Sequence, residues 1–406
     1  MFKIAWRNLW RNRRRTSLTM AAVAFSVFFL NFMMSLQEGS YGMMLKSSTK
    51  TWNGKLRIFR KSYFGRESLS KSFVMDDNLR RKLDSLNLNW TERIDGFALV
   101  SFENRTYGAS ITGLDPMREI KTTSIHTKLI EGRFLNEGEK NSTLLGDKLA
   151  ENLNLRLEDE IAVVAQGKDG SIGAKLLKVK GIFRTGMVEL DRSKMITVLE
   201  DADELFSMDG TVTSAVLYFE RGQKEINRIK ETINEWLGGT DLEVLDWKEI
   251  MPEALELIEF DRISGYLMYA VLVIIIAFGL LNTVHMAVYD RKKEIAVLRA
   301  IGMKRVKLAR MIISETVFLS AIGAVAGFIL SYPVILYFKS HPIRLSGKVA
   351  EVMESFMFIP ELHVALSFKV MFFLSVCVLI VAVVMTVFPS MRAVRENLAG
   401  QLKFEK

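Results

Sequence analysis

The stretch "YAVLVIIIAFGLLNTV", Tyr269–Val284, contains sixteen residues without an acidic or basic side chain. It lies within an apolar run over 263–288, and three further apolar runs occupy 18–36, 311–338 and 364–388. A helix crosses a bilayer with about 20 apolar residues. None of the four runs carries a Lys, Arg, Asp or Glu in its central part, where a charge is most costly. The sequence therefore predicts an α-helical membrane protein with four transmembrane helices.

The first run has features of both a signal peptide and a membrane anchor. The preceding segment is basic, and "RRRTSLT" (Arg13–Thr19) partly resembles a twin-arginine signal. However, the run is longer than the apolar region of a signal peptide, and no small-x-small cleavage site follows Leu36. These two properties favour an uncleaved anchor, with a cleaved signal as the alternative.

The basic residues of the chain, whose formal net charge is +9, are concentrated in three segments. These lie before the first run, between the second and third, and after the fourth, whereas the segment between the third and fourth is poorer in Lys and Arg. Loops rich in Lys and Arg stay in the cytoplasm. We therefore expect a multi-pass protein of the inner (plasma) membrane, with both termini cytoplasmic and its large domain periplasmic. No nucleic-acid-binding motif offers another explanation for the charge.

The expected organisation has nine parts. In order, they are a cytoplasmic amphipathic N-terminal helix (1–15), a first transmembrane helix (16–37), an extracytoplasmic α+β domain with stalk helices (38–261), a second transmembrane helix (262–289), a cytoplasmic helical segment (290–310), a third transmembrane helix (311–338), an extracytoplasmic loop (339–363), a fourth transmembrane helix (364–389) and a cytoplasmic tail (390–406). In the first part, Phe2, Trp6, Leu9 and Trp10 recur at helical spacing, which suits a helix lying in the membrane interface. The alternative is a plain basic flank of the first transmembrane helix.

The segment between the first two runs mixes strand and helix patterns. "KLRIF" (Lys55–Phe59) and "SAVLYF" (Ser214–Phe219) are typical of strands, whereas "DDNLRRKLDSL" (Asp76–Leu86) and "QKEINRIKETINEWL" (Gln223–Leu237) have helical spacing. "GKDGSIG" (Gly167–Gly173) is rich in turn residues and predicts a hairpin between its flanking strands. This mixture predicts an α+β domain inserted between transmembrane helices 1 and 2.

Motifs for catalysis or metal binding are missing from the sequence. The four histidines, His126, His285, His341 and His363, form no HExxH pattern, and there is no GxSxG or GxxxxGK[ST] motif. The single cysteine, Cys377, allows no intrachain disulfide and lies among apolar or small residues. We therefore expect no catalytic residue, no metal site and no ATPase activity in this chain.

Three segments carry a resemblance to a known family. "YDRKKEIAVLRAIGMKRVKLARMIISETVFLSAIGAVAGFILSYP" (Tyr289–Pro333) resembles the FtsX-type permease domain, and "FPSMRAVRENLAGQL" (Phe388–Leu402) resembles the end of that domain, without its second proline. "EGRFLNEGEKNSTLLGDKLAENLNLRLEDEIAV" (Glu131–Val163) resembles the MacB-type periplasmic core. Four spans with no fused ATPase are most similar to the lipoprotein-releasing permeases of the LolC/LolE family. Those of the LolC type dock a periplasmic carrier through a proline-containing hook, and "GKDGSIGA" has no proline at the equivalent position.

The resemblance implies a permease subunit of an ABC transporter. It implies a separate cytoplasmic ATPase that binds ATP and Mg²⁺, a second permease copy or paralogue, and contact with membrane lipids. The implied activity is release of lipoproteins from the inner membrane toward the outer membrane, which would add a lipoprotein cargo and a periplasmic carrier as partners. Two alternatives remain: MacB-like export of another amphiphile, and FtsX-like, ATP-coupled regulation of a cell-envelope hydrolase without transport.

The resemblance also assigns a coupling role to the cytoplasmic helix. Its ATPase-contacting residues would be Arg291, Glu294, Ile295, Leu298, Arg299, Ala300, Ile301 and Gly302. Within this set Ile295, Leu298 and Ile301 recur at i, i+3 and i+6 and offer an apolar face, and Gly302 suits a helix stop. The alternative is a basic loop that only follows the positive-inside rule, which explains the charges but not the apolar face.

Two further features fall in the third run. Gly323 and Gly327 form a GxxxG pattern, which permits close packing of membrane helices but is also common by chance in apolar segments. Glu315 lies just inside the run. It is either a functional intramembrane charge or a partner of a nearby base such as Arg310.

Overall fold

The computed structural model describes residues 13–64, 68–290, 292–350 and 361–395. The predicted N-terminal amphipathic helix through residue 12, Arg291, residues 351–360 of the predicted outer loop and the tail from 396 lie outside the described residues. The chain divides into two compact units. A helical unit comprises Met1–Gly42, Leu257–Arg344 and Glu361–Lys406, and an α+β unit comprises Met43–Glu256 and Leu345–Pro360.

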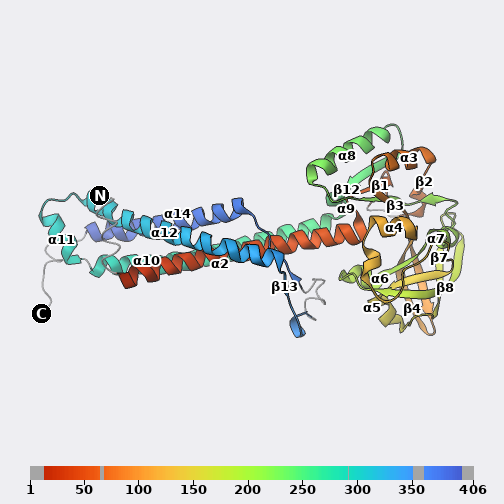
Figure 1. The fold of residues 1–406 in the computed structure, drawn as a ribbon, viewed down its shortest axis with the longest axis horizontal. Coiled ribbons are helices and arrows are strands. Elements are labelled where there is room, and N and C mark those ends of the chain that lie inside the picture. The colour runs from red at the N-terminus through yellow and green to blue at the C-terminus, as the bar shows by residue number, and fades with distance from the viewer. Residues whose placement is uncertain (1–12, 65–67, 291, 351–360, 396–406) are drawn as a thin grey trace. The chain divides into compact units, whose positions relative to one another are not determined.

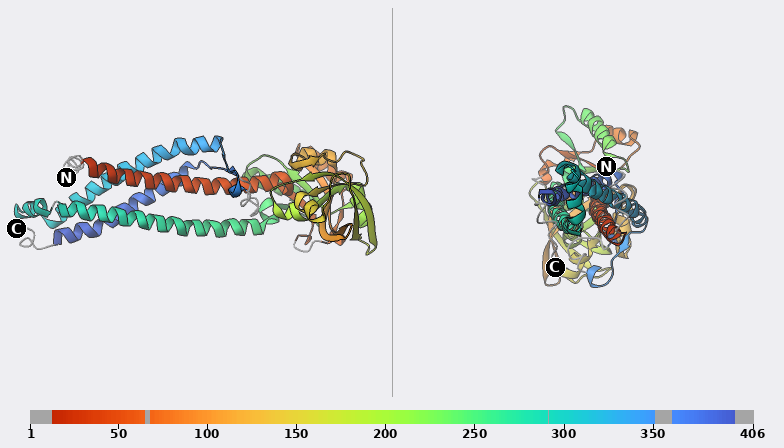
Figure 2. Two further views of the ribbon diagram at one scale, coloured as in Figure 1. Left: turned by 90° about the horizontal axis from the view of Figure 1, so that it is seen from below. Right: turned by 90° about the vertical axis from the view of Figure 1, so that its left-hand side faces the viewer.

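Four long apolar helices dominate the helical unit and run alongside one another (Figures 1 and 2). They are α2 (Arg13–Ser48), α10 (Pro252–Asp290), α12 (Arg305–Ser340) and α14 (Phe368–Arg395). At 1.5 Å rise per residue, the 39 residues of α10 extend for roughly 58 Å, well beyond a hydrocarbon layer of about 30 Å. Helices α2 and α10 therefore continue past their predicted spans.

The fourth long helix begins later than the sequence predicts. The predicted span starts at residue 364, but α14 starts at Phe368. Before it, the short strands β13 (Ile343–Arg344) and β14 (Glu361–Leu362) pair, and the backbone N–H of Ala365 donates to the carbonyl of Ser35 on α2 over 2.8 Å. This contact holds the segment before Phe368 in an extended path, which apolar composition alone does not reveal.

The α+β unit contains twelve strands and a set of short helices among its described residues. The strands are β1 (Leu56–Arg60), β2 (Phe73–Val74), β3 (Asn89–Phe102), β4 (Arg105–Leu114), β5 (Leu129–Gly132), β6 (Ser142–Gly146), β7 (Glu160–Gln166), β8 (Ile172–Phe183), β9 (Lys194–Val198), β10 (Thr211–Val212), β11 (Ser214–Tyr218) and β12 (Leu242–Asp246). The α-helices are α3 (Asp77–Ser85), α4 (Pro116–Thr122), α5 (Asp147–Leu153), α6 (Val188–Ser193), α7 (Leu199–Phe206), α8 (Gln223–Trp236) and α9 (Trp247–Ile250). A π-helical turn, η1 (Thr49–Asn53), follows α2, and the 3₁₀ turns η2 (Leu69–Lys71) and η3 (Ile125–Lys128) lie in the connections.

Ten of the strands form one sheet, in the order β12-β1-β11-β3-β4-β9-β6-β8-β5 with β7 joined to both β3 and β8. The pairing of β7 with both neighbours closes six strands, β3-β4-β9-β6-β8-β7, into a ring. Side chains of successive residues in a strand point to opposite faces. Each strand of the ring therefore has one row of side chains facing inward and one facing outward.

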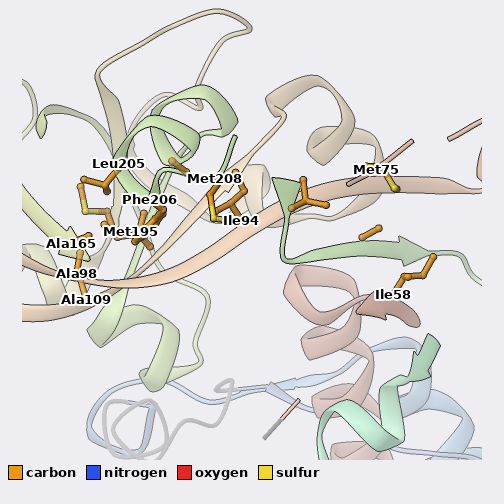
Figure 3. Packing of buried hydrophobic residues seen from close by; sticks show 14 of the residues in the cluster. Ile58, Met75, Ile94, Ala98, Ala109, Ala165, Met195, Leu205, Phe206 and Met208 are labelled. Atoms are coloured by element: carbon orange, nitrogen blue, oxygen red, sulfur yellow. The ribbon is translucent and has the colours of Figure 1, made fainter. Parts of the chain in front are cut away.

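The inward rows and α7 form one part of the main hydrophobic core, which continues to β1, β11, β12, α3 and α8 and is partly shown in Figure 3. Ala98, Ala109 and Ala165 contribute small side chains from three strands, and Phe206 of α7 is fully buried among them. A Cβ atom on Gly96 would lie 2.6 Å from the Phe206 ring. The glycine in β3 therefore makes room for the aromatic ring that fills the interior.

Two elements that the sequence predicted from short local patterns are present in the structure. The hairpin around Gly167–Gly173 forms between β7 and β8, with Val163 opposite Lys175. Helix α3 begins after Asp76, whose carboxylate accepts a 2.7 Å hydrogen bond from the N–H of Leu79. The structure thus has four long apolar helices and a large α+β domain between the first and second of them.

Candidate functional site

The predicted coupling segment forms helix α11 (Lys292–Ala300), a tight turn, and the first turn of α12. Gly302 has a φ of +96°, a backbone conformation that residues other than glycine rarely adopt. The N–H of Gly302 donates to the carbonyl of Arg299 over 3.0 Å, and the N–H of Met303 donates to that of Leu298 over 3.0 Å. This pair of bonds is the Schellman motif that ends helices at a glycine.

Part of the predicted apolar face of α11 is covered within the chain. Ile295 is only 3% exposed, because it packs against Leu308, Met311 and Ile312 at the start of α12. Leu298 is partly buried by the same cluster. The apolar character of Ile295 is therefore explained by contact within the chain, and its contact with an ATPase stays a prediction. The spacing of the apolar residues at the start of α12 was the sequence signal that this helix covers Ile295.

The exposed side of the same turn carries a different pair of apolar residues. Ile301 is 79% exposed and Val297, four residues earlier on α11, is 50% exposed. Exposed polar neighbours surround them in sequence, namely Glu294, Lys304, Arg305 and Lys307. We call these six residues the turn surface. Ala300 and Gly302 are also exposed, Arg299 is half-buried, and Arg291 lies outside the described residues.

Gly323 and Gly327 of α12 both face α2. A Cβ atom on Gly323 would lie 2.8 Å from the Cβ of Val23, and one on Gly327 would lie 2.4 Å from the carbonyl oxygen of Ala24. Such distances leave no space for a side chain. The GxxxG pattern thus lies where two of the long helices approach each other closely.

Polar contacts inside the helical unit were missed by the sequence reasoning. Asn31 of α2 is fully buried and its side-chain amide donates to the hydroxyl of Ser331 on α12 over 3.3 Å. Gln37 of α2 accepts a 2.8 Å hydrogen bond from the hydroxyl of Tyr269, and the hydroxyl of Tyr41 donates to the carboxylate of Asp261, joining α2 to α10. A lone Asn within the apolar run 18–36 was the available signal.

A buried ionic cluster lies where η1 meets the sheet of the α+β unit. The guanidinium of Arg93 is fully buried and pairs with Glu119 at 2.5 Å. It donates to the backbone carbonyl of Trp52 over 2.9 Å and lies 4.1 Å from the centre of the Trp52 ring. The ammonium of Lys194 lies 4.9 Å from the same ring. The Trp52 ring is therefore within cation–π distance of two cations.

The neighbouring carboxylate of Asp95 balances this positive charge. It pairs with Arg57 at 2.8 Å and lies 3.5 Å from Lys194. Burial by itself raises the pKa of Asp95, but attraction to Lys194, Arg57 and Arg93 outweighs it and holds that pKa well below its ordinary range. Burial lowers the pKa of Lys194 despite its attraction to Asp95. No motif in the sequence indicated this cluster, because its members come from three separate strands, a helix and the turn η1.

Comparisons with known proteins identify both parts of the chain. Residues 16–220 match the MacB-like periplasmic core domain, and residues 266–398 match the FtsX-like permease C-terminal domain. An ABC transporter permease of Methanocaldococcus jannaschii is 22% identical over 80% of this chain and 81% of its own length. The lipoprotein-releasing system transmembrane protein LolC of Xylella fastidiosa is 24% identical over 77% of this chain and 76% of its own length. The periplasmic region of MacB from Actinobacillus actinomycetemcomitans is 14% identical, with a TM-score of 0.37 over 52% of this chain and 95% of its own.

Proposed function

This chain belongs to the FtsX/MacB family of ABC transporter permeases, and from that premise we propose that it releases lipoproteins from the inner membrane. A permease of this class works with an ATPase, and the sequence holds no ATPase domain of its own. The chain then has to receive work in the cytoplasm and deliver it to its extracytoplasmic domain. Each of these two tasks needs residues that the fold leaves accessible.

The turn surface is the proposed contact for the ATPase. The observation that supports this contact is that Ile301 is 79% exposed, on a turn whose backbone conformation is set by Gly302. An isoleucine this exposed gains most from a partner that removes it from water. The exposed bases Lys304, Arg305 and Lys307 could pair with acidic groups around such a partner. This replaces the face of Ile295 and Leu298 with one that the fold leaves open.

Co-purification tests this contact. The full chain is isolated from native membranes in mild detergent, and associated subunits are identified by mass spectrometry. We expect an ATPase with the wild-type chain, and its loss with Ile301→Asp and with Val297→Asp. The matched control is Val74→Asp in β2, an exposed apolar residue of the α+β unit, which should retain the ATPase. An ATPase that remains bound to Ile301→Asp contradicts the assignment.

The lipoprotein cargo is supported by the similarity to LolC over 77% of the chain. The test reconstitutes the chain with its co-purified ATPase and any second permease into vesicles that contain a triacylated lipoprotein. We expect ATP-dependent release of the lipoprotein, and no release of a transmembrane-anchored version of the same protein. Release without ATP, or equal release of both versions, argues against this function.

Regulation of an envelope hydrolase is the second candidate, because FtsX-like residues alone do not specify transport. Under this alternative the complex hydrolyses ATP but releases no lipoprotein, and a cell-wall hydrolase binds the extracytoplasmic domain. The reconstitution above separates the two candidates.

A further inference from the structure

The outward face of the six-stranded ring carries an unusual group of apolar residues. They are Phe97 and Leu99 of β3, Val164 of β7, and Ile172 and Leu176 of β8, and each is between 42% and 80% exposed. We call these five residues the apolar wall. The residues that alternate with them, such as Ala98, Val163 and Leu177, are buried in the core. The wall is therefore not an exposed part of the core but a second apolar face.

The wall is continuous across the strands. Leu99 is opposite Val164 in the β3–β7 pair, Val164 is opposite Ala174 in the β7–β8 pair, and Leu176 is opposite Ala162. Opposite residues of antiparallel strands share a face, and neighbouring strands are about 4.8 Å apart. The side chains of the wall thus lie on one surface without a gap between strands.

No charged residue interrupts this surface. The other outward positions in the same three rows, across β4, β3, β7 and β8, are Ser101, Thr106, Gly108, Ser110, Ala162, Gln166 and Ala174. Charged residues border it on two sides: Glu160 opposite Lys178 on one side, and Asp95, with Lys194 opposite Ser110, on the other. The backbone groups between these strands are engaged in pairing with each other. The wall therefore offers a partner almost only apolar contact.

The size of the wall limits what can cover it. Its five side chains expose roughly 500 Å² of apolar surface, which matches the largest patch on a typical soluble protein, often a functional one. A stable protein dimer buries about 800 Å² per partner and forms about one hydrogen bond per 100–200 Å². The wall is smaller than a dimer interface and offers few hydrogen-bonding groups. These properties favour a hydrocarbon occupant over a second copy of the chain.

We propose that the apolar wall binds the acyl chains of an amphiphile on the extracytoplasmic side. This inference rests on the proposed function, since it gives the α+β unit a place to receive the apolar part of a released cargo. The uncharged wall complements an uncharged hydrocarbon chain, and burial of apolar area is the only driving force it needs. The polar part of the amphiphile would then lie toward the border row of Glu160 and Lys178.

The test uses a fluorescent reporter in the wall. Cys377, the single native cysteine, is replaced by Ser, and Ala174→Cys receives an environment-sensitive dye in the full chain, in lipid nanodiscs. The probe is a synthetic dipalmitoyl lipopeptide, and the same peptide without acyl chains is the negative probe. We expect a saturable blue shift with the acylated peptide only. Leu99→Lys should weaken this binding about tenfold, the size expected for losing one large apolar contact.

Val74→Lys is the matched control, because Val74 is 67% exposed, against 57% for Leu99, but lies in β2 and is not part of the wall. It should bind like the parent chain, and both variants should unfold at the parent's temperature, since the substituted side chains face solvent.

Four results overturn the proposal: no shift, an equal shift with the unacylated peptide, a shift with nanodisc lipid alone, or a shift that depends on protein concentration. The last two would indicate a membrane surface or a second copy. If the lipopeptide binds but no ATP-dependent lipoprotein release occurs, the apolar wall is supported and lipoprotein release is refuted as the function. If Leu99→Lys abolishes lipopeptide binding but lipoprotein release continues, the function is supported and the role of the wall is refuted.

Discussion

Arg93 is the buried cation on which the attachment of Trp52 to the sheet depends. Replacing it in Arg93→Met leaves the carboxylate of Glu119 buried without its pair and removes the donor to the Trp52 carbonyl. Breaking a buried ion pair costs about 3–5 kcal/mol. We expect a clearly lower unfolding temperature of the purified full chain, followed by tryptophan fluorescence.

Arg60→Met is the control for Arg93→Met. Arg60 pairs with Asp241 at 2.7 Å, but both side chains are largely exposed, and such pairs contribute at most about 1 kcal/mol. The double variant Arg93→Met/Glu119→Leu should recover part of the loss, because it removes the unpaired charge as well. Equal effects of Arg93→Met and Arg60→Met would argue that the cluster contributes no more than a surface pair.

Asp95 makes the stability of the folded chain depend on pH. Its pKa is lower in the folded chain than in the unfolded chain, so the folded state favours the charged form. The resulting stabilisation is complete above the ordinary pKa of about 4 and is lost as the pH falls toward the folded value. Asp95→Asn should therefore destabilise the chain at pH 7 and approach the wild type at low pH. Unfolding temperatures measured from pH 7 to pH 3 check this, and a constant difference over that range contradicts it.

Helices α2 and α12 depend on glycine for their close approach. Gly327→Ala introduces a methyl group 2.4 Å from the carbonyl oxygen of Ala24, and backbone atoms cannot move aside cheaply. Overpacking of this kind costs about 1–3 kcal/mol. The control is Gly279→Ala in α10, where nothing lies within 4 Å of the added methyl group. Thermal unfolding in detergent should separate the two variants, and an unchanged Gly327→Ala would show that the helices can part without loss.

Helix α11 shows what periodicity can and cannot predict at the scale of an element. The sequence predicted both the helix and its end at Gly302, because a helical pattern followed by glycine is a local signal. It also predicted an apolar face, but it could not say which partner covers each residue. Ile295 packs within the chain and Ile301 does not, a difference set by the turn into α12 rather than by spacing.

At the scale of the whole molecule, the same distinction separates local from distant pairing. The β7–β8 hairpin was predictable because its turn residues lie between its strands. The ring was not, since it depends on β7 meeting β3 and β4 meeting β9, pairs separated by 61 or more residues in the register. The apolar wall and the cluster around Trp52 are consequences of those distant pairings. The sequence alone therefore predicts the membrane helices and the fold class, but neither the apolar wall nor the buried cluster.

Orientation in the membrane is the property on which every functional assignment depends. Lys and Arg between the second and third helices predict a cytoplasmic turn surface and a periplasmic β7–β8 hairpin. In the Cys377→Ser background, Asp169→Cys and Lys307→Cys place exposed thiols on the hairpin and on the turn, respectively. A membrane-impermeant maleimide should label Asp169→Cys in right-side-out membrane vesicles and Lys307→Cys only after permeabilisation. The background chain without an added cysteine controls for non-specific labelling. The opposite pattern would put the turn surface out of reach of a cytoplasmic ATPase and would refute the coupling proposal together with the topology.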